Sequence, residues 1–485
     1  MDKDNAEGFT QAASPGDAAL LGLGAAAAVA AMQRGEFTAE RYATALLEQV
    51  ERWSTLNAFR TLDRDAVLQA ARAADERRRR GGALGRLHGL PVPVKDSVNT
   101  RALPTSNGTL SLSGFRPSAD AGVIGLLGEE GAIVMGKTNL HELSFGWTSN
   151  NETFGAVRNP YDLARSPGGS SGGSAAAVSA RMAPLAVAED TWGSIRLPAS
   201  FCGIAGFRPS RGRYPDDGIM PLSRNFDQVG PLARFVEDLV LFDRIAARDA
   251  RAIEPRPVTE MRVAVPAALW AELDPEVERV ARHALARLRE AGVSVVEIAG
   301  SLNEVARAAG IVGTIVAAEL RGSVADFLRR HEAGVAFDEL YATLGSNTKN
   351  LMDAMVLPPH TPTREAYEAA LRERNALAAS VAAGMREHRA DVLAFPVAMV
   401  RAPRIGEETG VTIDGGRTVD ALGRNVGLGS CVGMASIVLP AGRADDGMPV
   451  GIEFAGLPGG DRDVLAIGLS LERLLGGVEP PAVRA

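Results

Sequence analysis

The sequence is poor in cysteine and has no excess of positive charge. Its two cysteines in 485 residues cannot form a disulfide framework, and no Cys-x-x-Cys pair is present for zinc or redox chemistry. Because 52 Lys and Arg stand against 59 Asp and Glu, the net charge is −7. Nucleic acid and anionic membranes require clustered positive charge, so we expect neither as a partner. Inert core thiols and a reducing, cytoplasmic location are therefore predicted.

Long apolar runs and a basic leader are also missing. The apolar stretch at residues 18–32 has only 15 residues, which is too short to cross a bilayer comfortably, and it predicts a packed helix. The preceding residues lack the basic region that opens a secretory signal. With 46% apolar and 23% charged residues, the composition is that of a soluble globular protein with a large core.

Short apolar runs bounded by glycine and proline alternate with segments of helical periodicity. The runs at 90–95 and 132–137 predict buried strands, and residues 121–130 between them predict a helix. This alternation indicates an α/β fold with a parallel or mixed core sheet. The other expected elements are helices at 39–50 (capped by Thr38), 65–80, 275–291 and 461–475, strands at 262–266, 293–298, 435–440 and 450–454, and loops near 345–350 and 357–363.

We expect one domain over residues 1–485, because no internal repeat and no long linker interrupt the chain. Within it, helices occupy about 18–80, a motif-rich core about 85–240, and a variable, mostly helical part about 302–420.

A Gly- and Ser-rich loop at residues 166–174 is the most unusual segment. A flexible linker could have this composition, but linkers seldom run directly into an alanine-rich helix, as this loop does from Ser174. A glycine-rich loop at a helix N-terminus presents free N–H donors that can stabilise an anion. Twenty residues later, residues 190–198 repeat the theme, with Ser194 flanked by glycine, acid and arginine.

A serine nucleophile needs a base, and the six histidines share no motif with either serine segment. Lysine can serve as the base where burial lowers its pKa. Lys95 ends the apolar run at 89–94, where a solvated lysine is not expected. A lysine at a strand end is more often part of a structural ion pair than a catalytic base, and Asp96 could be its partner in such a pair.

These three segments together resemble the amidase signature family. Its Pro-x-x-Val-Lys-Asp, Gly-Gly-Ser-Ser-Gly-Gly-Ser and Gly-Ser-Ile-Arg-x-Pro patterns occur here in that order, at 91–96, 168–174 and 193–198. The resemblance is strong over residues 35–240 and weaker over 420–475. It implies a large mixed sheet covered by helices on both sides.

The resemblance also implies a reaction and its residues. Ser194 is the expected nucleophile, Ser170 the bridging serine after a cis Gly169–Ser170 bond, and neutral Lys95 the base. An acyl-enzyme hydrolysed by water is expected, without a metal or organic cofactor. The further implied site residues are the oxyanion-hole N–H groups of Thr191, Trp192, Gly193 and Ser194, the supporting residues Asp190, Arg196 and Ser171, and the substrate contacts Trp192, Ser144, Phe145 and Gly146.

One position departs from the family pattern inside the oxyanion loop. The family reads Gly-Thr-Asp-Thr-Gly-Gly-Ser, whereas residues 188–194 read Ala-Glu-Asp-Thr-Trp-Gly-Ser. If the replaced glycine requires a positive φ, an indole there would be strained. We expect Trp192 to wall the acyl pocket and select substrate shape, and the alternative is a neutral substitution that points into the core.

The implied function is hydrolysis of a C–N amide bond in a small aryl or arylalkyl amide, because residues 141–151 and 207–215 look most like indoleacetamide and mandelamide hydrolases. Carbamate (urethane) or anilide hydrolysis by the same chemistry is an alternative. A glutaminase-type subunit of an amidotransferase complex is an alternative of another class. An α/β-hydrolase is disfavoured, because its nucleophile turn requires a preceding strand and the chain before residue 168 is rich in turn residues. A zinc hydrolase site at His141 is disfavoured, because the second histidine of its motif is absent. A monomer or homodimer with a small-molecule substrate is expected.

Overall fold

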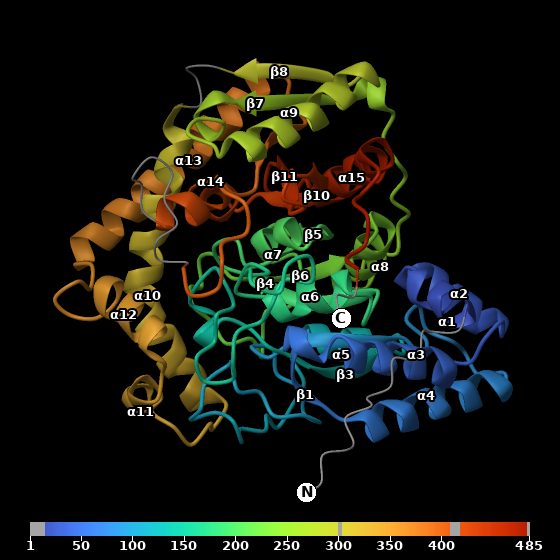
Figure 1. Cartoon of the computed structure of the whole chain (residues 1–485). Helices are drawn as coiled ribbons and strands as arrows, with labels where there is room; N and C mark the ends of the chain where they lie inside the picture. The colour runs from blue at the N-terminus through green and yellow to red at the C-terminus, as the bar shows by residue number, and fades with distance from the viewer. Residues whose placement is uncertain (1–14, 299–302, 408–417, 483–485) are drawn as a thin grey trace, which may run out of the picture.

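The computed structural model describes residues 15–298, 303–407 and 418–482. In this part of the chain, an 11-stranded mixed sheet runs through the molecule (Figure 1). Its strands are β1 (Phe59–Leu62), β2 (Pro91–Lys95), β3 (Ile133–Thr138), β4 (Leu185–Asp190), β5 (Ala205–Arg208), β6 (Gln228–Ala233), β7 (Arg262–Pro266), β8 (Ser294–Ile298), β9 (Val392–Pro396), β10 (Ala435–Arg443) and β11 (Pro449–Gly456).

The sheet combines two short parallel groups with an antiparallel centre. Its strand order is β1-β3-β2-β4-β6-β5-β10-β11-β9-β7-β8. β2 is parallel to β3 and β4, and β7 is parallel to β8 and β9, while the pairs from β4 through β9 are antiparallel. Every residue of β2 and β4 is buried, as expected for strands covered on both faces.

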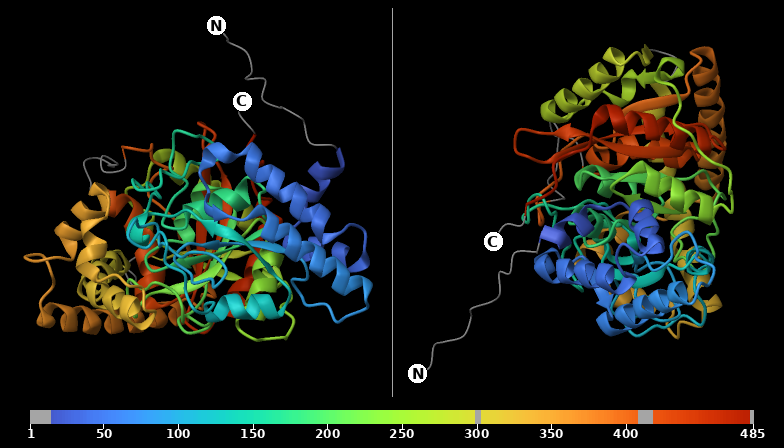
Figure 2. Two further views of the ribbon diagram at one scale, coloured as in Figure 1. Left: turned by 90° about the horizontal axis from the view of Figure 1, so that it is seen from below. Right: turned by 90° about the vertical axis from the view of Figure 1, so that its right-hand side faces the viewer.

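Helices pack against the sheet, and two groups of helices lie on opposite sides of the molecule. They are α1 (Pro15–Gly22), α2 (Ala25–Arg34), α3 (Ala39–Arg52), α4 (Arg64–Arg79), α5 (Gly122–Glu129), α6 (Gly172–Ser179), α7 (Arg196–Phe201), α8 (Val236–Ala246), α9 (Pro275–Glu290), α10 (Ala308–Arg330), α11 (Phe337–Ala342), α12 (Ser346–Met355), α13 (Arg364–Glu387), α14 (Thr418–Val432) and α15 (Asp461–Leu475). Figure 2 shows the yellow and orange helices α10–α13 on the side opposite the blue N-terminal helices. One contiguous apolar cluster joins residues from α1 to α15.

The predicted sheet and most predicted elements are confirmed, with boundaries that differ from the predicted ones by at most three residues. Strands β1, β4, β5, β6 and β9 were not predicted. β4 is rich in alanine and runs directly into the nucleophile segment, β5 has only four residues and contains glycine, and β6 contains both glycine and proline, so none of the three shows a clear strand pattern. The division into one domain stays a prediction.

Two predicted elements are wrong. The helix expected at 18–32 is broken between α1 and α2. At the start of α2, the N–H of Ala26 donates to Asp238 Oδ1 at 2.9 Å. Gly24 leaves room for this carboxylate, since a Cβ there would lie 2.8 Å from Asp238 Oδ2. The loop expected at 345–350 is helical from Ser346. Carboxylates from a distant segment stabilise this helix start: Gly345 N–H donates to Glu142 and Asn347 N–H to Glu152.

Helix α10 is 23 residues long and apolar enough, by length and composition alone, to cross a membrane. Here it packs against α13 and α14, and about half of its most apolar window is buried inside the protein. The same helix borders the pocket described next.

Candidate active site

Three separate segments meet at one edge of the sheet. Lys95 is the last residue of β2, Ser170 lies two residues before α6, and Ser194 lies in the turn between β4 and α7. Because β2 and β4 are parallel neighbours, paired at Val94 and Val187, their carboxyl ends lie at the same edge. Lys95 and the turn that carries Ser194 are therefore brought together by strand pairing.

The three side chains form a continuous hydrogen-bonded row. Lys95 Nζ lies 2.6 Å from Ser170 Oγ, and Ser170 Oγ is hydrogen bonded to Ser194 Oγ at 3.0 Å, a pair in which either hydroxyl can donate. The Gly169–Ser170 peptide bond is cis, as the resemblance implied. Lys95 and Ser170 are fully buried, whereas Ser194 retains 5% exposure at the pocket. This arrangement can move a proton from the accessible serine to the buried amine.

Lys95 has an ion-pair partner that differs from the expected one. Its Nζ lies 2.6 Å from Glu189 Oε1, inside the protein. Burial lowers the pKa of Lys95, and the Glu189 charge opposes this change. The suggested mate, Asp96, instead faces Lys137 Nζ at 3.5 Å and accepts a hydrogen bond from Ser106. Glu189 was missed in the sequence because it lies on β4, an unpredicted strand that brings this side chain beside β2.

A buried charge network holds the turn around Ser194. The Asp190 carboxylate accepts from Arg196 Nε and Nη2, both at 3.0 Å, which confirms the expected pair. It also accepts from the N–H of Ile195 at 3.1 Å and from Arg208 at 3.3 Å. Burial alone would raise the pKa of the Asp190 carboxyl, but the two guanidinium groups outweigh it and hold that pKa below its usual range.

The oxyanion-hole prediction needs correction at Gly193. Its N–H donates to Asp190 Oδ1 at 2.8 Å and is therefore committed to the turn itself. The N–H groups of Thr191, Trp192 and Ser194 have no acceptor within the described part of the chain. Gly193 takes the positive φ of 93°, whereas Trp192 has no positive φ, so the strain considered for the indole does not arise. Ser171 has a structural contact, since its Oγ donates to the carbonyl of Glu189 at 3.1 Å.

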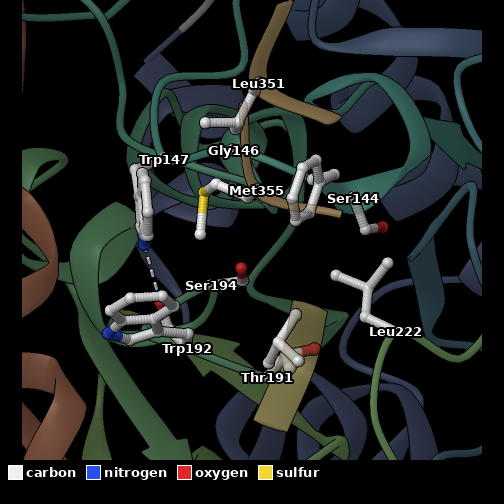
Figure 3. A pocket seen from close by; sticks show the side chains of 11 residues that line it. Ser144, Gly146, Trp147, Thr191, Trp192, Ser194, Leu222, Leu351 and Met355 are labelled. Carbon is white, nitrogen blue, oxygen red and sulfur yellow. Dashed lines mark hydrogen bonds between the residues drawn. The ribbon is translucent and has the colours of Figure 1, made fainter. Parts of the chain in front are cut away.

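A mostly apolar pocket opens onto Ser194 (Figure 3). Its empty volume, including the space open to solvent, is about 380 Å³. The figure shows the Ser194 hydroxyl between the two tryptophans on one side and Ser144 and Leu222 on the other. The lining residues are Ser144, Phe145, Gly146, Trp147, Thr191, Trp192, Ser194, Leu222, Val316, Leu351 and Met355.

Trp192 both lines this pocket and packs into its wall. Its ring meets Trp147 edge to face, with centroids 5.0 Å apart and an interplanar angle of 87°. Its Nε1 donates to the Gly423 carbonyl at 2.8 Å. The ring fits because two glycines face it: a Cβ at Gly423 would lie 3.1 Å from the indole, and one at Gly313 would lie 3.4 Å away. The indole therefore lies both at the pocket wall and in the core, and its role in selecting substrate shape stays a prediction.

Comparison with known proteins identifies the family. The family described as Amidase matches residues 41–465. The chain belongs to the amidase family. It is 35% identical to mandelamide hydrolase from Pseudomonas putida (93% of this chain, 90% of the relative) and 33% identical to indoleacetamide hydrolase from Agrobacterium vitis (92% and 95%). It is also 33% identical to one of the subunits of glutamyl-tRNA(Gln) amidotransferase from Chloroflexus aurantiacus (92% and 96%).

Solved structures confirm the fold of this amidase. A crystal structure described as an amidase superposes with a TM-score of 0.83 at 31% identity, and covers 93% of this chain and 99% of its own. The large mixed sheet with its helices is therefore that of amidase signature enzymes. The protein is an amide-hydrolysing enzyme.

The sequence located part of the pocket of this amidase and missed the rest. The four expected substrate contacts, Ser144, Phe145, Gly146 and Trp192, all line it. The missed residues are Trp147, Leu222, Val316, Leu351 and Met355. Trp147 directly follows the expected group and could have been found, but the residues on α10 and α12 carry no motif, and only folding brings them to the site.

Histidine does not complete the relay in this arrangement. His141 is the histidine in this region, and burial lowers its pKa to about 4, helped by the positive charge of Lys95. Its Nδ1 lies 3.4 Å from Thr148 Oγ1, and its backbone N–H donates to the carbonyl of Ser170 at 3.1 Å, but among the described residues its ring makes no hydrogen bond to Ser170 Oγ or Ser194 Oγ. Within the described ranges, no group of three or more His, Cys, Asp or Glu side chains is arranged to hold a metal ion.

Proposed function

We propose that this amidase hydrolyses the C–N bond of a small aryl or arylalkyl amide through an acyl-enzyme on Ser194, with Ser170 and Lys95 as the proton relay. One observation carries the proposal. The row from Lys95 Nζ through Ser170 Oγ to Ser194 Oγ, with spacings of 2.6 and 3.0 Å, ends at an apolar pocket.

The relay determines the order of the steps. Neutral Lys95 accepts the proton of Ser170 while Ser170 accepts that of Ser194, and Ser194 Oγ attacks the carbonyl carbon. The N–H groups of Thr191, Trp192 and Ser194 stabilise the oxyanion. The proton then returns through the relay to the leaving amine, and water cleaves the acyl ester by the same path.

The pocket lining favours an aromatic substrate. Trp147, Trp192 and Phe145 present aromatic surface, and Leu222, Leu351 and Met355 add aliphatic surface close to Ser194. Such a lining stabilises a planar ring through apolar contact and edge-to-face stacking. Two relatives are named as hydrolases of mandelamide and indoleacetamide, amides that carry an aromatic ring on the acyl side.

The alternatives differ in the substrate they would require. A carbamate or anilide would use the same relay, and nothing in the row of Lys95, Ser170 and Ser194 selects against it. A glutaminase subunit would have to hold the charged backbone groups of glutamine, yet no charged side chain is among the described residues that line the pocket. The aryl amide is therefore the favoured substrate class.

The test is a substrate panel on the purified chain. We expect kcat/KM to be highest for arylalkyl primary amides, lower for anilides and aryl carbamates, and negligible for glutamine. The Ser194→Ala variant serves as the matched control for nonspecific hydrolysis. Preferred turnover of carbamates would show that the substrate class is carbamates and not aryl amides. Turnover of glutamine only in the presence of partner subunits would show that the protein is a glutaminase-type subunit. We also propose a cytoplasmic monomer or homodimer, which size-exclusion chromatography of the same sample tests in part.

A further inference from the structure

Glu189 is a buried carboxylate that the proposed reaction does not use. Lys95 Nζ lies between two acceptors, Ser170 Oγ and Glu189 Oε1, each at 2.6 Å. The Lys95 side chain is fully buried, and that of Glu189 is 4% exposed. Burying a charged pair is costly unless its geometry serves it well, so a carboxylate at this place calls for an explanation.

Glu189 has few other partners. Ser97 Oγ lies 3.4 Å from the same carboxylate oxygen, which makes a weak hydrogen bond. Within the described residues, no arginine and no second lysine forms an ion pair with Glu189. The matching residue in the family pattern is threonine, which carries no charge. The charge of Glu189 therefore acts on Lys95 by direct contact and, through space, on the carboxyl of Asp227.

The other titratable groups near Lys95 are either paired with an opposite charge or neutral. On β4, Asp190 is neutralised by Arg196 and Arg208. His141 is neutral, because its pKa lies near 4. On β3, Lys137 faces Asp96, the residue after Lys95.

Asp227, just before β6, is the remaining carboxyl near Lys95. It accepts from Thr191 Oγ1 at 2.6 Å and has no hydrogen bond to Nζ. Burial raises the pKa of Asp227 to about 8, so at neutral pH it is mostly protonated. Glu189 is thus the carboxylate in direct contact with the amine.

We propose that Glu189 is a positioning residue of the relay, an inference that rests on the proposed function. Glu189 holds Lys95 Nζ against Ser170 Oγ and balances the positive charge that Lys95 gains. In the acylation step the Ser194 O–H bond breaks as its Oγ bonds to the carbonyl carbon. That proton passes to Ser170, the proton of Ser170 passes to Nζ, and the carbonyl π electrons move to the oxyanion. The ammonium group formed in this way lies on Glu189 Oε1, and no further reactant is needed.

The arrangement has a consequence for pH dependence. Burial favours the neutral amine of Lys95, and the Glu189 charge favours the ammonium. Without that charge, the amine would lose its proton at a lower pH but would be a weaker base. The rising limb of kcat/KM should then move to lower pH, while the plateau at high pH falls.

The test compares Glu189→Gln, which keeps size and hydrogen bonding but removes the charge, with the matched control Ser97→Ala, which removes the weak hydrogen bond of Ser97 Oγ to Glu189. We expect Glu189→Gln to reduce kcat by about 10- to 1,000-fold with little change in KM. Its rising limb should shift to lower pH by half a unit or more. Ser97→Ala should keep the limb of the wild type, and Glu189→Asp should recover part of the loss.

Two further measurements separate the possible outcomes. Labelling of Ser194 by a fluorophosphonate, followed against pH, reports serine activation without any assumption about the substrate. Thermal unfolding shows whether each variant folds. If Glu189→Gln does not fold, Glu189→Thr, which introduces the residue of the family pattern, replaces it in the test. An unchanged limb together with lower thermal stability would overturn the positioning role and leave a structural one.

The remaining outcomes also decide the question. If Asp227→Asn moves the limb and Glu189→Gln does not, the pH effect belongs to Asp227 and the inference fails. If Lys95→Ala remains fully active, the relay of the proposed function fails, whatever Glu189 does. Loss of activity in Lys95→Ala with no effect in Glu189→Gln would overturn the role of Glu189 alone.

Discussion

The two regions that build the active site are constructed differently. At the ends of β2 and β4 and in the loop before α6, the polar side chains of Lys95, Asp190 and Ser170 are buried and hydrogen bonded. On α10 and α12, the contributions to the same pocket are Val316, Leu351 and Met355, whose side chains are apolar.

This difference separates reactivity from selectivity. A buried polar network tolerates little change, because each lost partner leaves an unsatisfied group. An apolar lining tolerates replacement by other apolar groups at modest cost. The strand ends can therefore keep one chemistry while the helical region adapts the pocket to different substrates.

The largest expected effect is at the relay. Lys95→Ala, Ser170→Ala and Ser194→Ala should each lower kcat by more than about a thousandfold, because each interrupts the proton path. Alanine variants of the six histidines, made singly, are the matched controls and should remain active. Loss of more than a thousandfold in any histidine variant, measured on the preferred amide, would contradict the lysine relay.

The next effect concerns stability of the same region. Asp190→Asn should lower the free energy of unfolding by about 3–5 kcal/mol, because Arg208 loses its carboxylate partner inside the protein and Arg196 keeps only Glu453. Glu51→Gln, which breaks an exposed ion pair with Arg64, should cost less than about 1 kcal/mol. Denaturant unfolding of both variants measures the contrast, and equal losses would show that the turn does not depend on this network.

Trp192 lies where the two regions meet, and its removal tests selectivity. Trp192→Gly should enlarge the acyl side of the pocket and favour bulky acyl groups. Relative kcat/KM for a large and a small acyl substrate should change by about tenfold to a hundredfold. An unchanged ratio would refute the role as a wall. A uniform fall in both rates, of about 10²–10³-fold, would assign Trp192 to the geometry of the oxyanion loop instead.

The pH dependence should follow Lys95. Since only the neutral amine accepts a proton, kcat/KM on an uncharged amide should rise from neutral to alkaline pH, by about tenfold per unit below the pKa of Lys95. Burial lowers this pKa against the opposing charge of Glu189, so the plateau should begin below the ordinary range of lysine. A flat profile, or one with an acid optimum, would speak against Lys95 as the base.

The smallest effect is expected on the helical side. Leu351→Ala removes apolar contact from the pocket without touching the relay, so relative kcat/KM across the panel should change by less than about tenfold. Leu110→Ala, an exposed leucine outside the pocket lining, should leave every ratio unchanged. If Leu351→Ala instead lowered all rates by a common factor, the separation of reactivity from selectivity would be wrong.

Local pattern by itself determines much of this protein. Glycine spacing and apolar runs indicate the strand end at Lys95 and the helix that follows Ser170, and the α/β class follows from the alternation of elements. These features depend on neighbours within a few residues, so their signal is present in the chain itself. Family resemblance then supplies the roles expected of Ser194 and Asp190, which local pattern alone leaves open.

Tertiary structure alone decided which distant groups meet. Glu189 reaches Lys95 because β4 lies beside β2, and Asp96 is drawn away by Lys137. Trp192 is accommodated because Gly313 and Gly423, each more than a hundred residues away, leave room for its ring. Contacts of this kind depend on strand order and helix packing, and no periodicity or spacing in the sequence encodes them.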